Sequence, residues 1–400
     1  MARPSGAPGA KRRAHIEARK ILAVLTPVLL LNFLLLTMPS LPAQNREAPP
    51  ADYLLYAGGF MRTTGKGIYA FRLHTATGQL SPLGLAAETT NPSFLAVHPN
   101  RRFLYAVVNQ PEGEVAAFAI DTTTGKLTLL NKVPSRGAGP CFVTLTKTGR
   151  TLLLANYGSG SAAAFPVQED GRLGEATGFA QHSGSSVDPL RQTGPHTHST
   201  NPSPDGRFAI AADLGLDKLF VYRLQNGRLL PNQPPVLNAA PGAGPRHLAF
   251  HPSGRYAYVA NELNSTVTAF HYDAASGTFR EIQTISAIPR DFSGTNYPAD
   301  LHVHPSGRFL YVSDRGLDAI AAFAIDLAEG TISPIEYTPV GGKTPRNFAI
   351  DPAGTLLVAG NEDSDNIVVF RIHAQTGRLT PTGGQASVAT PACLQFVPAP

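Results

Sequence analysis

Seven copies of one short pattern run along this 400-residue chain. Each copy contains an apolar segment with an aromatic residue near its end, such as IYAFRL or VTAFHY, and the aromatic positions are Phe71, Phe118, Phe165, Tyr222, Phe270, Phe323 and Phe370. Successive positions lie 47 to 57 residues apart. A repeat of this length with several short strands is typical of β-propeller blades, which bury their faces against one another. The pattern predicts seven blades.

Every repeat is interpreted as four strands and no helix. A turn such as HPSG (251–254 and 304–307) or DPAG (351–354) joins two apolar runs, because Pro, Asp and Gly favour tight turns. The run before this turn is expected to form the innermost strand of a blade, and the run after it the second strand. Glycine-containing turns such as TATGQL and AASGTF follow the aromatic segment and lead into an outer fourth strand. The predicted fold class is all-β.

The two ends of the repeat region complement each other. PACLQFVP (391–398) has the pattern of an innermost strand with nothing after it, and DYLLYAGG (52–59) that of a second strand with nothing before it. We therefore predict a seven-bladed β-propeller in which one blade is closed by both termini. Such a ring has no exposed sheet edge inside it, which favours a monomer.

The first 43 residues differ from the repeats. Residues 1–20 hold six Lys or Arg and one Glu, and residues 21–38 form an uncharged apolar run. This order predicts a secretory signal peptide cleaved after Ala43. The alternative is an uncleaved membrane anchor, since 18 apolar residues are near the lower limit for a span. We divide the chain into a signal peptide or anchor (1–43), a linker (44–51) and a propeller (52–400). The protein is then exported, periplasmic or secreted, or held at the membrane by residues 21–38.

Charge and cysteine content exclude some functions. Without residues 1–43 the chain holds 27 basic and 27 acidic side chains, so charge gives no argument for a nucleic-acid partner. The cysteines are Cys141 and Cys393. Both fall on predicted inner strands two blades apart, and we expect buried free thiols rather than a disulfide.

Innermost strands line the channel of a propeller, so polar residues there are candidate site residues. Equivalent positions, one per blade, are Ser93, Cys141, His198, Arg246, Ala299, Arg346 and Ala392. The positions that follow them are Phe94, Phe142, Ser199, His247, Asp300, Asn347 and Cys393. The ends of the second strands add Glu262 and Arg315. Charged groups concentrate in consecutive blades, which predicts one pocket at one mouth of the channel, formed by His198, Arg246, His247, Glu262, Asp300, Arg315 and Arg346.

This set of side chains suits an anionic substrate or a developing oxyanion, because guanidinium groups bind such oxygens in fixed geometry. It does not suit a metal, since the arginines would repel a divalent cation and no zinc or calcium spacing appears. We predict no metal and no cofactor. The alternative is a structural role, with Arg246 and Glu262 forming an ion pair between neighbouring strands. The turn histidines His98, His251 and His304 are predicted to be solvated turn residues.

Three long segments resemble the seven-bladed propeller lactonases. They are 185–224, which contains PHTHSTNPSPDG, 244–270, which begins GPRHLAFHPSGRYAYVANEL, and 296–316, which ends YVSDRG. The family includes bacterial 6-phosphogluconolactonases of the propeller type and the fungal carboxy-cis,cis-muconate cyclising enzyme, and the resemblance covers nearly all of 52–398. It implies that His198, Arg246 and Glu262 are catalytic, with Arg315 as the fourth member. We add as substrate-binding residues His196, His247, Asp300 and Arg346.

The activity that the resemblance implies is opening of a lactone ring by water. Glu262 or His198 would take a proton from the water, while Arg246 and Arg315 stabilise the oxyanion and an anionic group of the substrate. Because export is predicted, an unphosphorylated aldonolactone or a carboxylated lactone is a candidate substrate beside a phosphorylated sugar lactone. The alternative function is a non-catalytic exported propeller that binds a small anionic ligand or a protein partner.

Overall fold

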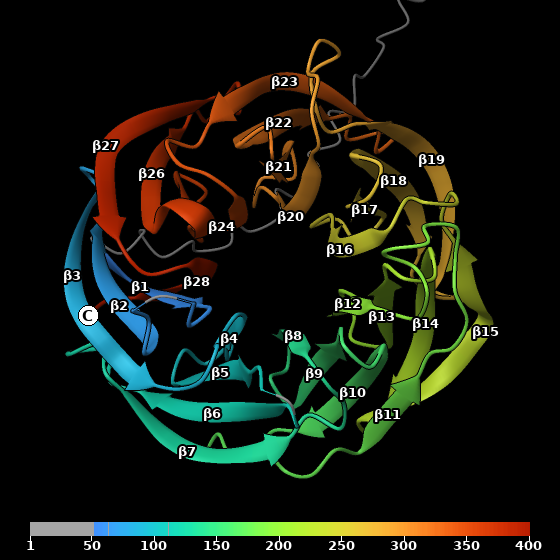
Figure 1. The fold of residues 1–400 in the computed structure, drawn as a ribbon, viewed down its shortest axis with the longest axis horizontal. Coiled ribbons are helices and arrows are strands. Elements are labelled where there is room, and N and C mark those ends of the chain that lie inside the picture. The colour runs from blue at the N-terminus through green and yellow to red at the C-terminus, as the bar shows by residue number, and fades with distance from the viewer. Residues whose placement is uncertain (1–51, 63, 111) are drawn as a thin grey trace, which may run out of the picture. The chain divides into compact units, whose positions relative to one another are not determined.

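The computed structural model describes residues 52–62, 64–110 and 112–400, and within them the chain forms seven four-stranded antiparallel sheets arranged in a ring (Figure 1). The predicted seven-bladed all-β propeller is confirmed. The predicted signal peptide or anchor and the linker lie outside the described residues. In the part of the chain that is described, no helix is long and apolar enough to cross a membrane.

Each blade runs from an inner strand at the channel to an outer strand at the rim. The inner strands are β4 (Leu95–Val97), β8 (Pro140–Leu145), β12 (Thr197–Pro202), β16 (Pro245–Phe250), β20 (Tyr297–Val303), β24 (Pro345–Ile350) and β28 (Pro391–Pro398). The second strands are β1 (Asp52–Gly59), β5 (Phe103–Val108), β9 (Thr151–Asn156), β13 (Phe208–Asp213), β17 (Tyr256–Asn261), β21 (Phe309–Arg315) and β25 (Leu356–Asn361).

The outer half of each blade carries the repeated aromatic segment and the rim strand. The third strands are β2 (Gly67–His74), β6 (Glu114–Ile120), β10 (Ser161–Pro166), β14 (Lys218–Gln225), β18 (Thr266–Asp273), β22 (Ala319–Ile325) and β26 (Asn366–Ile372). The outer strands are β3 (Gln79–Glu88), β7 (Leu127–Pro134), β11 (Gly178–Gln181), β15 (Arg228–Asn238), β19 (Thr278–Ser286), β23 (Ile332–Pro339) and β27 (Leu379–Ser387). A short 3-10 turn, η1 (Glu362–Ser364), follows β25.

The ring is closed by strands from the two ends of the described chain. β28 is the inner strand of the sheet β28-β1-β2-β3, and it pairs with β1 from Tyr53 opposite Pro398 to Gly59 opposite Pro391. These are the two segments predicted to share a blade, so the predicted closure is confirmed. Each inner strand is therefore paired with a second strand in all seven sheets.

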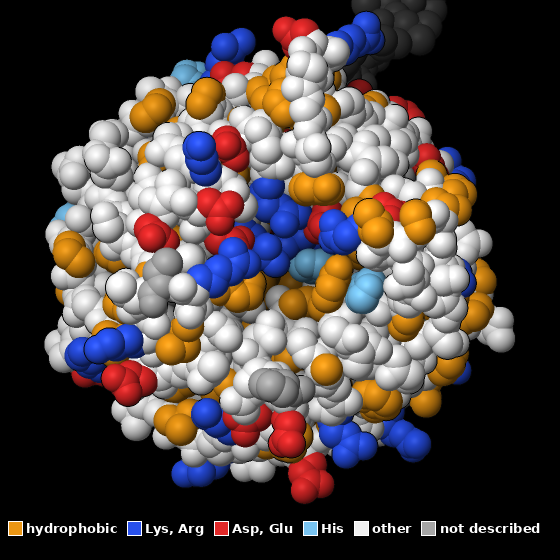
Figure 2. Space-filling view, viewed as in Figure 1, with side chains coloured by type: hydrophobic (Ala, Val, Ile, Leu, Met, Phe, Trp, Pro, Cys, Tyr) orange, Lys and Arg blue, Asp and Glu red, His pale blue; other side chains and the backbone are white. Residues whose placement is uncertain are grey.

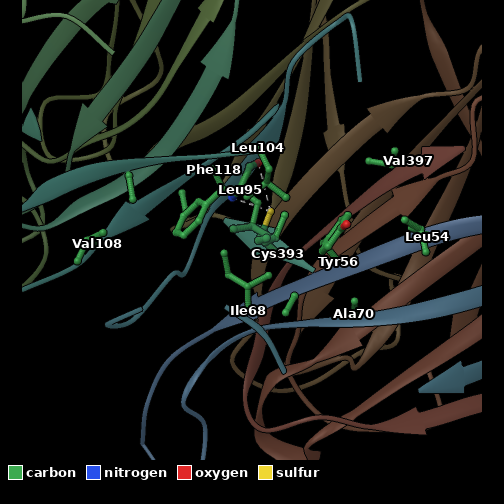
Figure 3. Packing of buried hydrophobic residues seen from close by; sticks show 14 residues of the cluster. Leu54, Tyr56, Ile68, Ala70, Leu95, Leu104, Val108, Phe118, Cys393 and Val397 are labelled. Carbon is green, nitrogen blue, oxygen red and sulfur yellow. Dashed lines mark hydrogen bonds between the residues drawn. The ribbon is translucent and has the colours of Figure 1, made fainter. Parts of the chain in front are cut away.

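Apolar side chains fill the space between neighbouring blades. Figure 3 shows Leu54 and Tyr56 of β1 and Cys393 of β28 packed with Leu95 and Phe118 of the next blade. The Cys393 thiol lies 3.3 Å from the amide nitrogen of Leu95 and links the two inner strands. Cys393 and Cys141 are free, as predicted. Because the core is divided among such interfaces, the central channel is left for polar residues.

Buried turn residues also hold adjacent blades together. The rings of His251 and His304 are 6% and 7% exposed, and their Nε2 atoms lie 2.9 Å and 2.8 Å from the carbonyl oxygens of Gly307 and Gly354 in the next blade. The prediction that these histidines are solvated was wrong, because the turn of one blade sits under the turn of its neighbour. His98, at the corresponding turn, is half-buried.

Candidate active site

The channel contains one cavity at each end. The upper cavity, about 340 Å³, opens on the face that carries the connections from second to third strands. Its polar lining includes Arg191, His198, Glu262, Arg315 and Arg346. Figure 2 views this face and shows Lys and Arg side chains gathered around the central hollow, with acidic and histidine side chains beside them.

The lower cavity, about 320 Å³, is lined by His247, Asp300, His302 and Asn347, among others. Between the two cavities lies an aromatic partition formed by Phe94, Phe142 and His247. The rings of Phe94 and Phe142 are 4.4 Å apart, and Phe142 and His247 are 5.1 Å apart, measured between centroids. The predicted single pocket is therefore two cavities separated by the partition.

Irregular pairing of the inner strands places the site residues. The register of β12 against β13 shifts between Thr197 and Ser199, and that of β16 against β17 shifts between Pro245 and His247. An extra residue at a β-bulge bends the strand and redirects its side chain. His198 and Arg246 are these extra residues, and Arg346 occupies the same position in β24.

Three arginines surround the carboxylate of Glu262. Arg191 Nη2 donates a 2.6 Å hydrogen bond to its Oε1. Arg246 Nε and Arg315 Nη2 each lie 2.9 Å from its Oε2, without the alignment of a hydrogen bond. Burial would raise the pKa of Glu262, but the Arg315 and Arg246 guanidinium groups outweigh it and lower the pKa to about 2. Glu262 is thus a carboxylate that orders arginines, and it is a weak base.

A second carboxylate repeats this arrangement two blades further on. Glu362 is 2% exposed, and its Oε1 lies 2.7 Å from Arg62 Nη1 while its Oε2 accepts a 3.3 Å hydrogen bond from Arg346 Nη1. The guanidinium carbons of Arg62 and Arg346 lie 4.8 Å and 5.0 Å from the ring centre of Phe60. Together five arginines share the carboxylates of Glu262, Glu362 and the more distant Asp363 at this end of the channel, so positive charge is in excess there.

His198 lines the upper cavity and is 5% exposed. Its Nδ1 has no hydrogen-bond partner among the described residues. Burial and the nearby Arg246 guanidinium hold the pKa of His198 well below its usual value. The imidazole is therefore neutral near pH 7.

Arg246, His247 and Asp300 lie deeper than predicted. Arg246 is 2% exposed, does not line the upper cavity directly, and reaches Glu262 from below. His247 and Asp300 line the lower cavity. The prediction that they share a pocket with His198 was wrong, because consecutive residues on either side of the bulge face different levels of the channel.

His196 lies in the wall behind the cavity. Its ring stacks on Tyr157 with centroids 4.4 Å apart, and its Nδ1 lies 3.0 Å from the backbone carbonyl oxygen of Tyr157. Tyr157 lines the upper cavity, and His196 is not among the lining residues. The substrate-binding role predicted for His196 stays a prediction.

Sequence reasoning missed Arg191. This residue lies in the long connection between β11 and β12, which has no counterpart in the other repeats. The same connection explains the widest spacing between aromatic positions, 57 residues from Phe165 to Tyr222. That insertion was a signal that a loop could reach the channel, but the sequence does not show which residue of it turns inward.

The remaining chemistry of the upper cavity is limited. Burial raises the pKa of the Cys141 thiol to about 12, so it is protonated and not a nucleophile at neutral pH. Its sulfur lies 3.4 Å from the backbone carbonyl oxygen of His198. Across residues 52–62, 64–110 and 112–400, no group of three or more His, Cys, Asp or Glu side chains is placed to hold a metal ion.

Comparison with known proteins agrees with this architecture. The family model described as "Lactonase, 7-bladed beta-propeller" matches residues 54–396. The chain is 41% identical to a 6-phosphogluconolactonase of Bacillus subtilis over 86% of this chain and 98% of that protein. It is 34% identical to a 6-phosphogluconolactonase of Formosa agariphila, over 72% of this chain and 84% of that protein.

Among solved structures, the periplasmic gluconolactonase of Pseudomonas aeruginosa matches with a TM-score of 0.82 and 35% identity, over 87% of this chain and all (100%) of that one. A putative 6-phosphogluconolactonase of Bacteroides fragilis matches with a TM-score of 0.81 and 36% identity, over 87% of this chain and 98% of that one. The residues matched by the family model, 54–396, include all those that line the upper cavity. The chain belongs to the family of seven-bladed β-propeller lactonases.

Proposed function

We propose that this protein hydrolyses a sugar-derived lactone in the upper cavity, with an anionic group on the substrate favoured. The observation that carries the proposal is the excess of arginines around Glu262 and Glu362, beside His198 with its unpartnered Nδ1. A buried positive field stabilises both an anionic substituent and the negative charge that develops on a carbonyl oxygen. The names of the relatives, 6-phosphogluconolactonase and gluconolactonase, support this substrate class.

In the proposed reaction, water adds to the lactone carbonyl carbon and the bond from that carbon to the ring oxygen breaks. The ring oxygen leaves as a hydroxyl, and the new carboxylic acid ionises and releases a proton. Arg315 lines the cavity and stabilises the oxyanion, and Arg246 adds its positive charge from below the cavity. Both guanidinium groups are in place before the substrate arrives, so their orientation costs nothing during the reaction.

His198 is the general base in this proposal. Glu262 is held as an anion by three arginines and has little affinity for a proton, whereas the imidazole of His198 is neutral and lines the upper cavity. The Arg246 charge lowers the pKa of His198 in the empty site. A bound anionic substrate offsets that charge, so binding itself makes His198 a stronger base.

The substrate is proposed to be met outside the cytoplasm. This rests on the basic and apolar pattern of residues 1–43. One relative, that of Pseudomonas aeruginosa, is described as periplasmic. An exported enzyme would encounter an unphosphorylated or carboxylated lactone as readily as a phosphorylated one. The arginines of the upper cavity would bind the negative group of the carboxylated or phosphorylated lactone.

Proton release tests the proposal. Glucono-1,5-lactone, its 6-phosphate and a carboxylated muconolactone are added separately to the purified protein, and acid production is compared with the spontaneous reaction. Acceleration that disappears in His198→Gln supports lactone hydrolysis and ranks the substrates. Binding of these lactones without any acceleration would favour the non-catalytic alternative.

A further inference from the structure

A line of contacts crosses the aromatic partition from the lower cavity to the arginines above it. His302 Nε2 lies 2.9 Å from Asp300 Oδ2, and Asp300 Oδ1 lies 2.8 Å from His247 Nδ1. His247 Nε2 lies 3.2 Å from Arg246 Nη1. Arg246 then reaches Glu262 through its Nε. The two cavities therefore do not share space, but they share this chain of side chains.

The direction of each hydrogen bond in this line is fixed by Arg246. A guanidinium has only donors, so Nε2 of His247 must accept from Arg246 and carries no proton. The single proton of the neutral ring is then on Nδ1, which donates to Asp300. Burial and Arg246 lower the pKa of His247 to about 4, so the ring is neutral near pH 7.

Both carboxylate oxygens of Asp300 accept further hydrogen bonds. Its Oδ1 also accepts a 3.0 Å hydrogen bond from the backbone nitrogen of Leu301, and its Oδ2 accepts from Asn347 Nδ2. Asp300 is 4% exposed and His247 is 3% exposed. An anion this buried and this fully bonded has little freedom to bind a substrate, but it can fix the ring next to it.

Apart from its ion pair with Glu262, Arg246 has one further hydrogen bond that orients it. Its Nη1 also donates to the backbone carbonyl oxygen of Ala299, the residue before Asp300. Its Nε contact with Glu262 is close but poorly aligned. The orientation of the Arg246 guanidinium is thus fixed by Ala299 of β20 and by His247, below the upper cavity.

We propose that Asp300 and His247 are positioning residues for lactone hydrolysis: Asp300 fixes the Nδ1–H form of His247, and His247 then holds the guanidinium of Arg246 beneath the reacting carbonyl. The lower end of the channel serves the upper site through this pair. The proposal replaces the predicted substrate-binding role of both residues and rests on the proposed function of the upper cavity.

The tautomer of His247 is measured directly by nitrogen NMR of protein labelled with ¹⁵N-histidine, since protonated and unprotonated ring nitrogens resonate far apart. His247→Phe identifies the resonances. We expect Nδ1 protonated and Nε2 unprotonated near neutral pH in the wild-type protein, and a mixture of forms in Asp300→Asn. A wild-type ring protonated on Nε2 would overturn the proposal.

Kinetics separate positioning from binding and from simple stability. His247→Phe and Asp300→Asn should lower kcat by about 10²-fold, because a misplaced catalytic group costs that much, with KM changed by less than about threefold. Lys147→Ala is the control, since Lys147 lines the lower cavity and has no hydrogen bond or ion pair with Asp300, His247 or Arg246 among the described residues. The kcat of this variant should stay within about twofold of wild type.

Each other outcome would contradict the positioning role of His247 and Asp300. A rise in KM with kcat unchanged would mean that His247 and Asp300 bind substrate. A lower melting temperature with unchanged kcat would mean that they only stabilise the fold. If the wild-type protein hydrolyses no lactone, the proposed function fails, while the NMR measurement still decides whether Asp300 sets the tautomer of His247.

Discussion

The two ends of the channel have cavities of nearly equal size, about 340 Å³ and about 320 Å³, but they differ in charge. At the upper end, arginines outnumber the carboxylates that hold them. At the lower end, the carboxylate of Asp300 is hydrogen-bonded by His247, His302 and Asn347. The lining of the lower cavity also contains Lys147. Volume therefore does not distinguish the two cavities. Unbalanced buried charge does, and it is the reason that the upper cavity is the proposed active site, because only uncompensated groups have interactions left for a substrate.

The difference arises where inner strands meet second strands. Bulges at His198, Arg246 and Arg346 turn one side chain per strand toward the upper end, and the 3-10 turn after β25 places Glu362 beside Arg346. The lower end is built instead from tight turns that pack against the neighbouring blade. The unbalanced charges and the packed turns thus lie at opposite ends of the same strands.

The largest effect is expected for Arg246→Ala. Removing a fixed positive charge from below the oxyanion should lower kcat by about 10²–10³-fold, measured by proton release from the best lactone. Lys147→Ala removes a cation from the lower cavity and is the matched control, with kcat expected within about twofold of wild type. Equal losses in the two variants would break the contrast between the two ends of the channel.

Glu262→Gln should lower kcat by about 10-fold to 10²-fold, because the arginines lose the charge that orders them. The melting temperature should fall as well, since buried Arg246 loses its counter-charge. The pH–rate profile distinguishes this role from that of a base. His198 must be neutral to act, and its low pKa means that activity persists below pH 6.5 and is lost only well below it. If Glu262→Gln no longer loses activity at low pH, the base is Glu262 and not His198.

Arg191→Ala sharpens the comparison by substrate. Arg191 lies on a loop and its side chain is 34% exposed. Without Arg191, Glu262 still has Arg246 and Arg315 as partners. The Arg191 guanidinium can therefore leave Glu262 and bind a negative group of the substrate instead. We expect KM for 6-phosphogluconolactone to rise about 10-fold and KM for glucono-1,5-lactone to change little. A similar rise for both lactones would show that Arg191 supports the cavity wall rather than recognising charge.

The smallest effect concerns Asp314, the neighbour of Arg315 at the end of β21. Its Oδ1 accepts from Asn296, but its Oδ2 has no partner among the described residues, and burial raises its pKa to about 8. The folded protein therefore keeps a proton that the unfolded chain loses near pH 3.8, so this group costs stability as pH rises from 3.8 toward 8.

Asp314→Asn removes that cost, and Asn156, Asn261 and Asn361 stand at the same strand end in three other blades. The melting temperature of the variant should exceed that of wild type by an amount that grows between pH 5 and pH 8, as followed by thermal unfolding at several pH values. A difference that stays constant with pH would show that Asp314 is already charged in the folded protein.

Much of the fold could be predicted because it is encoded locally. The turns and the alternating apolar runs set four strands per repeat, and the incomplete repeats at 52–59 and 391–398 were correctly paired into one blade. The site could be predicted only in part. Equivalent positions on the inner strands identified His198 and Arg346, and strand ends identified Glu262 and Arg315, which all line the upper cavity.

The rest depended on features that have no local pattern. Sequence spacing does not show that Arg246 is the extra residue of a bulge, so it cannot predict that His247 lines a different cavity from His198. Nor can it predict the burial of His251 and His304, because the contacts that bury them come from the next blade. Arg191 lies in a loop whose path is set by the blades on which it rests.

By itself, the sequence determined the number of blades, their strands and the closure of the ring, because a repeated turn and strand pattern has the same physical meaning in every copy. Only the tertiary structure decided which charges meet. Arg191 and Glu262 are 71 residues apart, and Arg246 touches Ala299 across 53 residues. Such pairs form because neighbouring blades converge at the channel, where the distance between side chains depends on packing around the ring and not on spacing along the chain.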